Sequence, residues 1–232
     1  MYHTPSPSST QLQTVSPAAT ATLTPTATLT PTVTLTKYPT HTATPLLPES
    51  HSIKGVSSHR QYFPLGCETS AAVDWALYYG VQITEYDFQF KLPQSDNPDK
   101  GFVGGVMGPW GQTPPYSYGV HAAPVAATLR EYGLNALGLK GMTLQDLKRQ
   151  IAGNHPVIAW VIGNCVGGIP YEYTDSVGDK VIVAAYEHVV IVIGYDAEKI
   201  RYLNNGQMYE TPVEVFMNSW GVLGNMAVVA SE

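Results

Sequence analysis

The sequence has few charged side chains. Asp, Glu, Lys and Arg make up 13% of its 232 residues, and the net charge is −6 with no basic run anywhere. Nucleic-acid binding needs clustered Lys and Arg, so we exclude a nucleic-acid partner. No apolar run approaches the ~18 residues of a membrane span, and the longest, 181–186 and 189–193, suit buried strands. The length fits one globular domain plus an extension.

Cysteine is also scarce, with Cys67 and Cys165 the two in the chain. A small disulfide-framed domain would use four or more, so a disulfide scaffold is not expected. A single bridge between the two remains open at this point, although we interpret Cys165 as a free structural thiol. The seven histidines show no metal-ligand spacing, and no phosphate-binding loop occurs. We therefore expect neither a metal nor a cofactor.

The first fifty residues differ from the rest, with fifteen Thr and eight Pro and a six-residue repeat of the type Thr-Ala-Thr-Leu-Thr-Pro from Thr20. We predict that residues 1–50 form a disordered tether. Thr/Pro-rich stalks are typical of exported proteins, so we expect an extracellular or cell-surface location. The alternative is a cytosolic low-complexity tail, because no apolar signal-peptide core precedes the segment.

Residues 51–232 have a globular composition, and the spacing of their apolar residues changes along the chain from a helical to a strand period. Helices come first, then mostly strands, which predicts an α+β domain with a helical half packed on an antiparallel sheet. A loop rich in Gly and Pro spans 93–118. Helices are expected at 67–79, 84–90, 121–132 and 143–152, strands at 156–162, 180–186, 187–195, 199–203 and 226–230, and a short helix to Trp220 opened by a capping box at Thr211–Glu214.

Cys67 stands where a loop enters the first predicted helix. Free amides and the helix dipole at that position stabilise a thiolate, which is the nucleophilic form of cysteine. The same amides, with the side chain of Gln61 six residues earlier, are placed to hold an oxyanion. The alternative for Cys67 is an inert buried thiol.

His188 opens a predicted strand, which would fix the direction of its imidazole. Histidine titrates near neutrality, so it can take the thiol proton and return it to a leaving amine. A carboxamide beside the ring would fix its tautomer, and Asn204 or Asn205 at the end of the next strand can supply it. The alternatives are a core histidine and ordinary Asn-Gly turn chemistry.

Taken together, Gln61 and Cys67 at a helix start, a His opening a strand and Asn at the end of the next strand resemble the papain-like cysteine peptidases. More closely, residues 49–230 resemble the double-glycine, or bacteriocin-processing, peptidases and their soluble standalone relatives. The resemblance extends to Asp96-Asn-Pro, Tyr118-Gly-Val-His-Ala and the Gly-Asn-Met-Ala ending at 224–227. It implies a papain-like fold with Cys67 as nucleophile, His188 as base, Asn204 as orienting group and Gln61 in the oxyanion hole.

The chain departs from that family at three points. Gly66 and Glu68 flank the cysteine where the family has a small polar residue and Gly, and Glu68 would raise the pKa of the thiol if its side chain faced it. Asn stands where the family usually has Asp, with Asn205 as second choice. The leader-processing members carry exporter helices that are lacking here, so Gly-Gly specificity does not carry over. Asn218, in a papain-like Asn-Ser-Trp-Gly, is a rival orienting group that we interpret as packing.

We predict a cysteine peptidase that hydrolyses peptide bonds through a thioester on Cys67, acting on a peptide or protein substrate as a monomer. One alternative is a catalytically silent peptide- or wall-binding module of the same fold. Another is a transpeptidase or ligase, in which an amine rather than water attacks the thioester. Trp110, Tyr116 and Tyr118 either line the cleft or anchor the loop, and His121 caps a helix or lines the cleft.

Overall fold

A computed structural model of the chain describes residues 46–231. The predicted tether 1–50 lies outside the described residues except for its last five positions. Residues 46–231 fall within one compact unit. Within them, every helix is too short or too polar to span a bilayer.

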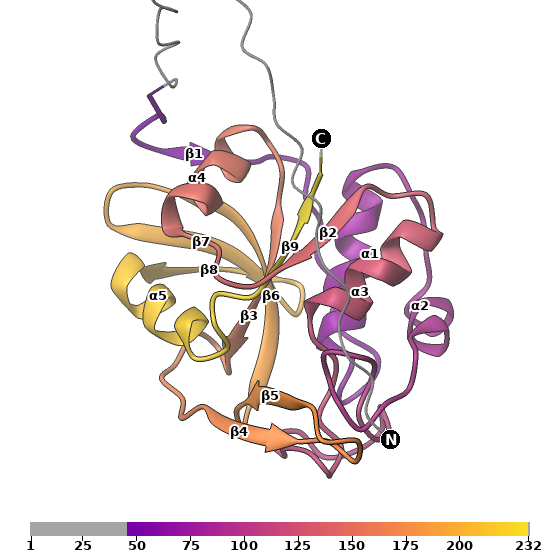
Figure 1. The fold of residues 1–232 in the computed structure, drawn as a ribbon. Coiled ribbons are helices and arrows are strands. Elements are labelled where there is room, and N and C mark those ends of the chain that lie inside the picture. Colours follow the sequence, from indigo (N-terminus) through magenta and orange to yellow (C-terminus); the bar gives the residue numbers. More distant parts are fainter. Residues whose placement is uncertain (1–45, 232) are drawn as a thin grey trace, which may run out of the picture. The chain divides into compact units, whose positions relative to one another are not determined.

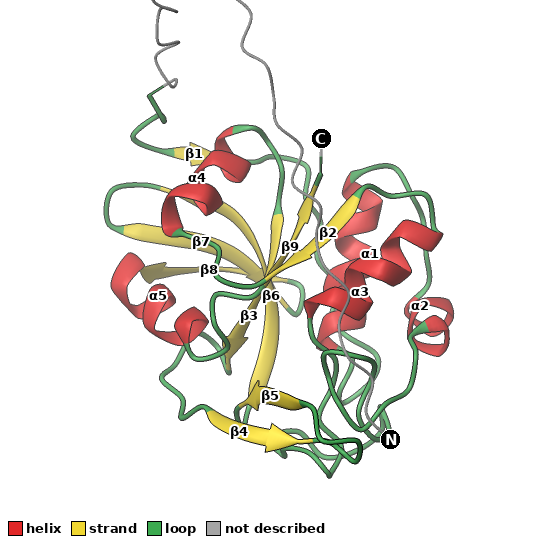
Figure 2. Cartoon of the chain, viewed as in Figure 1, coloured by secondary structure: helices red, strands yellow, loops and turns green. Residues whose placement is uncertain are grey.

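The core is a seven-stranded sheet in the order β2-β9-β3-β6-β7-β8, with β1 also paired to β6, and its strands pair antiparallel. Figure 2 shows how the strands and helices are arranged. A separate ribbon of β4 and β5 lies at the bottom of Figure 1. The strands are β1 (His51–Ser52), β2 (Ala136–Leu139), β3 (Val157–Ile162), β4 (Tyr171–Thr174), β5 (Lys180–Val183), β6 (Glu187–Tyr195), β7 (Lys199–Asn204), β8 (Gln207–Pro212) and β9 (Ala227–Ala230).

Helices lie on both sides of this sheet. Figure 1 shows α1, α2 and α3 grouped on one side and α4 and α5 on the other. Cover on both faces explains why β3 and β6 are almost continuous apolar runs rather than alternating ones. The helices are α1 (Cys67–Tyr78), α2 (Glu85–Lys91), α3 (Ala122–Glu131), α4 (Leu144–Ala152) and α5 (Val213–Gly221). The predicted α+β architecture, with the cysteine on the first helix and the histidine in the sheet, is confirmed.

Local signals placed several helix ends correctly. Gly80, with φ of 81°, follows the end of α1 as the predicted stop, because glycine adopts this left-handed conformation without strain. The Thr84 side chain accepts a hydrogen bond from the backbone N–H of Asp87 and caps α2. Thr143 and Asp146 form a reciprocal capping box at the start of α4.

The capping box predicted at Thr211 is wrong. Thr211 pairs with Ile200 as part of β8, and α5 begins after Pro212 with no side-chain cap. The local pattern assigned Thr211 to a helix start, but pairing with β7 places it in a strand. Strands β2, β4 and β8 were not predicted, since β2 is only four residues long and β4 and β8 are mostly exposed and polar.

Candidate active site

The segment 61–66 leads directly into α1 and places Cys67 at the first position of the helix. Gly66 is the N-cap and has no side chain to compete for the free amides of the first turn. A Cβ at Gly66 would lie 3.0 Å from the Cβ of Phe63, so the turn is also close-packed. Cys67 is 5% exposed and lines a pocket.

His188 lies near the start of β6, and its Nε2 is 2.8 Å from Oδ1 of Asn204. The strand register explains this contact. Ile191 pairs with Leu203, so in the same register Asn204 lies opposite Val190 and on the same face as His188. Burial lowers the pKa of His188, and the hydrogen bond to Asn204 opposes that shift. The ring is therefore held neutral and oriented by an uncharged partner.

Asn205 has a different contact. Its Oδ1 accepts a hydrogen bond from the backbone N–H of Gln61, at 2.9 Å, and its φ of 54° turns the chain after β7. Of the two candidates left open by the sequence, Asn204 is the one that contacts the histidine. The rival Asn218 lies on α5 and does not line the pocket.

The four predicted site residues converge on one pocket. The elements that contribute are the segment before α1, the Gly/Pro-rich loop, the turn after β3, β6 and the end of β7. The lining residues are Gln61, Pro64, Cys67, Trp110, Gly163, Asn164, His188, Asn204 and Asn205. Such a constellation can carry out acyl transfer, because a thiol, an oriented imidazole and free helix amides face the same space.

Gln61 lines the pocket, but both of its amide protons are engaged. Its Nε2 donates to the carbonyl oxygens of Phe63 and Pro64, at 2.8 and 3.1 Å. A carboxamide nitrogen has two donors, so none is left for an oxyanion in this conformation. The side chain would have to turn away from this loop to serve the predicted role.

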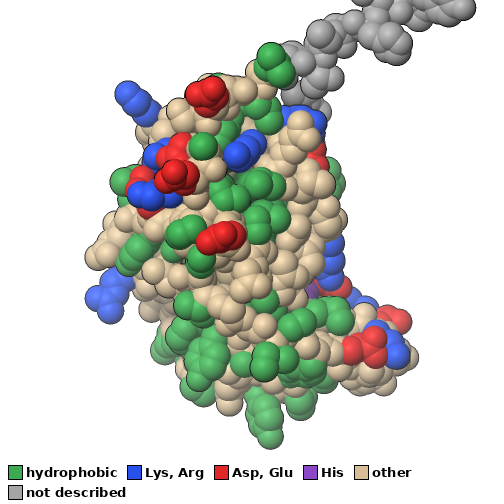
Figure 3. Space-filling view, turned by 90° about the vertical axis from the view of Figure 1, so that its left-hand side faces the viewer, with side chains coloured by type: hydrophobic (Ala, Val, Ile, Leu, Met, Phe, Trp, Pro, Cys, Tyr) green, Lys and Arg blue, Asp and Glu red, His purple; other side chains and the backbone are tan. Residues whose placement is uncertain are grey.

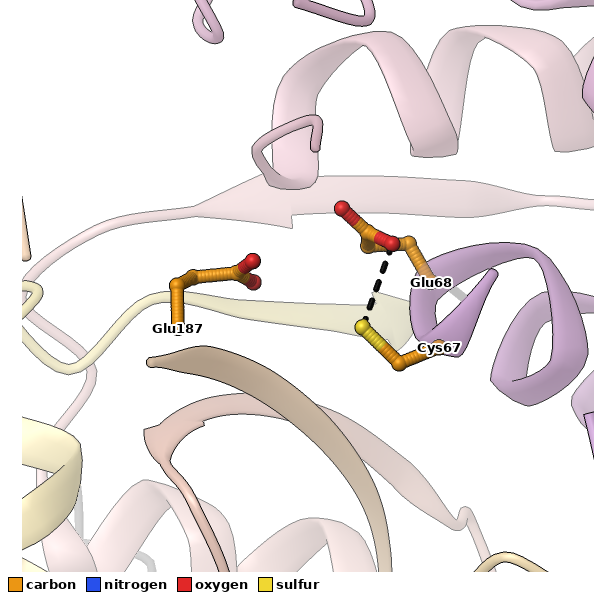
Figure 4. Close-up of side chains that lie close together, drawn as sticks. All are labelled: Cys67, Glu68 and Glu187. Atoms are coloured by element: carbon orange, nitrogen blue, oxygen red, sulfur yellow. Dashed lines mark hydrogen bonds between the residues drawn. The ribbon is translucent and has the colours of Figure 1, made fainter. Parts of the chain in front are cut away.

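The carboxyl group of Glu68 faces the thiol. Cys67 Sγ donates to Oε2 of Glu68 at 3.2 Å (Figure 4). Oε1 of Glu68 accepts from the backbone N–H of Val120 at 2.6 Å. Burial, and then the charge of Glu68, raise the pKa of the Cys67 thiol well above its ordinary value. The helix start therefore does not by itself produce a thiolate here, and Glu68 adds to the effect of burial in the direction that the sequence predicted.

A second carboxyl group, that of Glu187, reaches the same place from the residue before His188. Glu68 is fully buried and Glu187 is 3% exposed. Burial raises the pKa of Glu68 to about 7, and burial and the charge of Glu68 raise that of Glu187 well above its ordinary value. Sequence reasoning missed Glu187. Its polar side chain at the start of an apolar strand was the available signal.

Trp110 and Asn164 complete the surroundings of the histidine. The Trp110 indole donates to the backbone oxygen of Glu187 at 3.0 Å, and its ring lies edge-on to His188 with centroids 6.2 Å apart. The cleft-lining hypothesis for Trp110 fits this position. Asn164, which sequence reasoning passed over, accepts hydrogen bonds from Asn204 and Tyr202 and so holds Asn204 in place.

The other residues singled out in the sequence lie outside the lining of this pocket. Both cysteines are free, which answers the question of a Cys67–Cys165 bridge. Tyr118 is buried, and its hydroxyl accepts a hydrogen bond from the backbone N–H of Ala184, whereas Tyr116 is 67% exposed. His121 is the N-cap of α3 without a side-chain cap bond, and it contacts Asp99 away from the pocket.

Comparison with known proteins gives a consistent result. The family model described as Peptidase C39 like family matches residues 53–228. A C39-like peptidase from Bacillus anthracis superposes with a TM-score of 0.70 at 21% identity, over 80% of this chain and 98% of that one. That likeness concerns the fold. A search of curated proteins found no match.

Two further solved structures are more distant. A double glycine motif protease from an AMS/PCAT transporter, solved with its leader peptide, matches at TM-score 0.45 and 14% identity, over 76% of this chain and 91% of that one. Xylellain, a cysteine protease from Xylella fastidiosa, matches at TM-score 0.45 and 13% identity, over 81% of this chain and 87% of that one.

Proposed function

Because the chain belongs to the peptidase C39-like family, we propose that it is a cysteine peptidase that cleaves peptide bonds through a thioester on Cys67, with His188 as general base. The observation that carries the proposal is the convergence of Cys67 and the Asn204-bound His188 on one pocket. A peptidase-type fold and family alone would not assign these roles.

In the proposed mechanism, Cys67 Sγ attacks the carbonyl carbon of the scissile bond while its proton passes to His188. The imidazolium then protonates the leaving amine, and the C–N bond breaks to give the thioester. Water, deprotonated by His188, attacks the thioester, the C–S bond breaks, and the acid is released while His188 returns the proton to Cys67 Sγ. Amides at the start of α1 stabilise the oxyanion, joined by Gln61 once its side chain leaves Phe63 and Pro64.

A neutral thiol in the resting enzyme is compatible with this route. The raised pKa of Cys67 and the lowered pKa of His188 favour the uncharged pair over a preformed thiolate–imidazolium pair. Proton transfer then accompanies attack on a bound carbonyl rather than preceding it. Asn204 orients the ring without adding charge.

The surroundings of the pocket support a peptide substrate. An apolar groove adjoins it and shares Trp110, Gly163 and Asn164 with it, and the groove also includes Ile169 and Tyr186. Ile169 is 84% exposed. Figure 3 shows hydrophobic side chains gathered at the bottom of the molecule, the end where Figure 1 places β4 and β5. An exposed apolar groove beside a nucleophile suits an extended peptide.

A peptidyl vinyl sulfone tests the assignment, because it reacts with a thiol that is positioned against its base. We expect covalent labelling of Cys67 in the wild type, none in Cys67→Ala, and labelling at least ~100-fold slower in His188→Ala. Cys165→Ser should behave as the wild type. Equal labelling rates with and without His188 would overturn the proposal.

A silent binding module is the second candidate, and the hydrogen bond from Cys67 to Glu68 specifically favours it. Such a module would bind peptides without labelling by the vinyl sulfone. A ligase would label like a peptidase but transfer its acyl group to an added amine. Mass spectrometry of products formed with and without an added peptide that has a free α-amino group separates hydrolysis from amine capture.

We also propose an extracellular or cell-surface location, supported by the Thr/Pro-rich composition of residues 1–50. Protease treatment of intact cells tests this. Loss of the protein without cell lysis is expected, and full protection would contradict the proposal.

A further inference from the structure

Three side chains that can bind a metal ion lie close together beside the pocket. The proposed peptidase mechanism uses one of them, Cys67, and gives no role to the other two, Glu68 and Glu187. The Sγ of Cys67 and a carboxylate oxygen each of Glu68 and Glu187 lie within 4.8 Å of one another, and all three residues are buried. Figure 4 shows the Glu187 side chain extending toward the other two. Two carboxyl groups and a thiol therefore share one enclosed space.

An unsatisfied oxygen points to a missing partner in this space. Oε1 of Glu187 is buried with no hydrogen-bond partner among the described residues, and the residue is only 3% exposed. Within residues 46–231, neither Glu187 nor Glu68 takes part in a salt bridge. A buried polar atom without a partner costs free energy, so such an atom calls for an explanation.

We propose that Cys67, Glu68 and Glu187 bind one divalent transition cation of the Zn²⁺ type. The distances fit. Zn–S and Zn–O bonds of about 2.3 and 2.1 Å in a tetrahedron put ligand atoms roughly 3.4–3.6 Å apart. Sγ and Oε2 of Glu68 are already 3.2 Å apart, so only Glu187 has to move inward.

The ligand set selects the class of cation. A thiolate favours borderline and soft metals, whereas Ca²⁺ and Mg²⁺ prefer oxygen ligands alone. Three protein ligands leave a fourth position for water, as in open zinc sites. Cys67 lines the pocket, which gives the cation a route from solvent. Binding replaces the thiol proton, which is released to solvent.

The second contact of Glu68 holds its carboxylate in place for the metal. Oε1 accepts from the backbone N–H of Val120, which leaves Oε2 directed at the sulfur. The neighbouring Gly119 leaves room for this carboxylate, since a Cβ there would lie 2.1 Å from Oε1. A fixed ligand loses less freedom when the metal binds.

Metal binding has a consequence for the active site. A cation on Cys67 Sγ occupies the lone pair that the nucleophile needs, so zinc at this site would inhibit the enzyme reversibly. The binding itself is independent of peptidase activity, whereas the inhibition rests on the proposed function. The two can therefore fail separately.

Cobalt titration of the metal-free full chain tests the site, because Co²⁺ bound to a thiolate has a charge-transfer absorption band. We expect one equivalent of Co²⁺ to produce the band in the wild type and in Cys165→Ser, and Cys67→Ala to lack it. Zn²⁺ should displace the Co²⁺, and Mg²⁺ should not. Glu187→Gln and Glu68→Gln should each weaken binding by at least ~10-fold.

His188→Ala is the matched control, since His188 is not one of the three ligands. It should keep the cobalt band while losing vinyl sulfone labelling, which separates this proposal from the peptidase proposal. In the wild type, Zn²⁺ should slow alkylation of Cys67 by iodoacetamide, and EDTA should restore it. Circular dichroism and thermal melting test whether each variant is folded. If Glu187→Gln does not fold, Glu187→Asp takes its place.

The proposal is overturned if the wild type gives no band at one equivalent, which would mean that protons alone neutralise the cluster. It is also overturned if the band survives both glutamine substitutions unchanged. Loss of the band in a folded His188→Ala variant would assign the cation to a Cys–His pair instead.

Discussion

At the scale of single residues, the reactivity of Cys67 depends on its neighbours more than on its place at a helix start. The sulfur donates to Glu68 while the imidazole of His188 is held by Asn204. The two groups that can accept the thiol proton are thus a carboxylate with a pKa of about 7 and an imidazole whose pKa is lowered by burial. The reactivity of the site therefore depends on which of these two groups accepts the thiol proton of Cys67.

Removing the charge of Glu68 should make the thiol more acidic. Glu68→Gln keeps an acceptor for the Val120 N–H and removes the carboxylate that raises the pKa of Cys67. We expect the pH midpoint of iodoacetamide alkylation, measured in EDTA, to fall relative to the wild type. Glu187→Gln should shift it less, since Glu187 affects the thiol less than Glu68 does. An unchanged or higher midpoint in Glu68→Gln would show that burial alone sets the thiol pKa.

Asn204 and Asn205 form a natural pair of matched substitutions. Asn204→Ala removes the hydrogen bond to His188 and frees the ring to rotate, so vinyl sulfone labelling should slow by at least ~10-fold. Asn205→Ala removes a contact to the backbone of Gln61 and should slow it less. The reverse order would mean that ring orientation is not the role of Asn204.

At the scale of elements, two contacts fix the segments around the pocket. Gly119 has φ of 134° and packs against the Glu68 carboxylate. His59 bonds both Asp74 on α1 and Glu85 on α2, at 2.8 and 2.6 Å, just before Gln61. The first contact seats the loop before α3 on the start of α1, and the second fastens the segment that leads into the cysteine.

Gly119→Ala should destabilise the domain by about 1–3 kcal/mol, because it adds a clash to an unfavourable backbone conformation. Gly80→Ala is the matched control. Gly80 also has a positive φ, of 81°, but nothing lies within 4 Å of its would-be Cβ. Urea unfolding should show the larger loss for Gly119, and equal losses would mean that the carboxylate moves aside freely.

The His59 contact should make stability depend on pH. Burial opposes the charge of His59, but the hydrogen bonds and charges of Asp74 and Glu85 outweigh it and raise its pKa above 6.5. A raised pKa stabilises the fold below the unfolded value of 6.5, and this contribution is lost as pH rises through the folded value. Burial also raises the pKa values of Asp74 and Glu85, which acts in the same direction.

Thermal melting of the wild type and His59→Gln between pH 5.5 and 9 measures this effect. The melting temperature of the wild type should exceed that of the variant at low pH, and the difference should shrink as pH rises. A difference that is constant across this range would show that the imidazolium is not what holds the segment.

At the scale of the whole molecule, the residues described around the pocket belong to the unit that contains residues 46–231. The sheet, its covering helices and the buried core lie within this range. The central strand β6 carries both His188 and Glu187, whose Oε1 has no hydrogen-bond partner among the described residues, and it pairs with β3 and β7 on either side. The domain should therefore supply the site without the first 45 residues.

A chain that begins at Leu46 tests this directly. Its melting temperature and its rate of Cys67 labelling by the vinyl sulfone should match those of the full chain. A large loss of either would show that residues 1–45 contribute to the domain, contrary to the predicted tether.

The sequence by itself determined the five helices, the longer apolar strands, the family resemblance and four residues that line the pocket, namely Gln61, Cys67, His188 and Asn204. These rest on local signals, such as the caps at Thr84 and Thr143 and the apolar run after His188, which act over a few positions. It could not decide between Asn204 and Asn205, because strand register depends on pairing between β6 and β7. The misassigned cap at Thr211 failed for the same reason.

Only the tertiary structure decided the electrostatics of the site. Glu68 and Glu187 are 119 positions apart in the chain, and no local pattern indicates that their carboxyl groups meet beside the thiol. Whether a charge raises or lowers a pKa depends on burial and on distances of a few ångströms. The sequence supplied the candidate nucleophile and its candidate base, and folding decided that two buried carboxyl groups would lie beside the thiol.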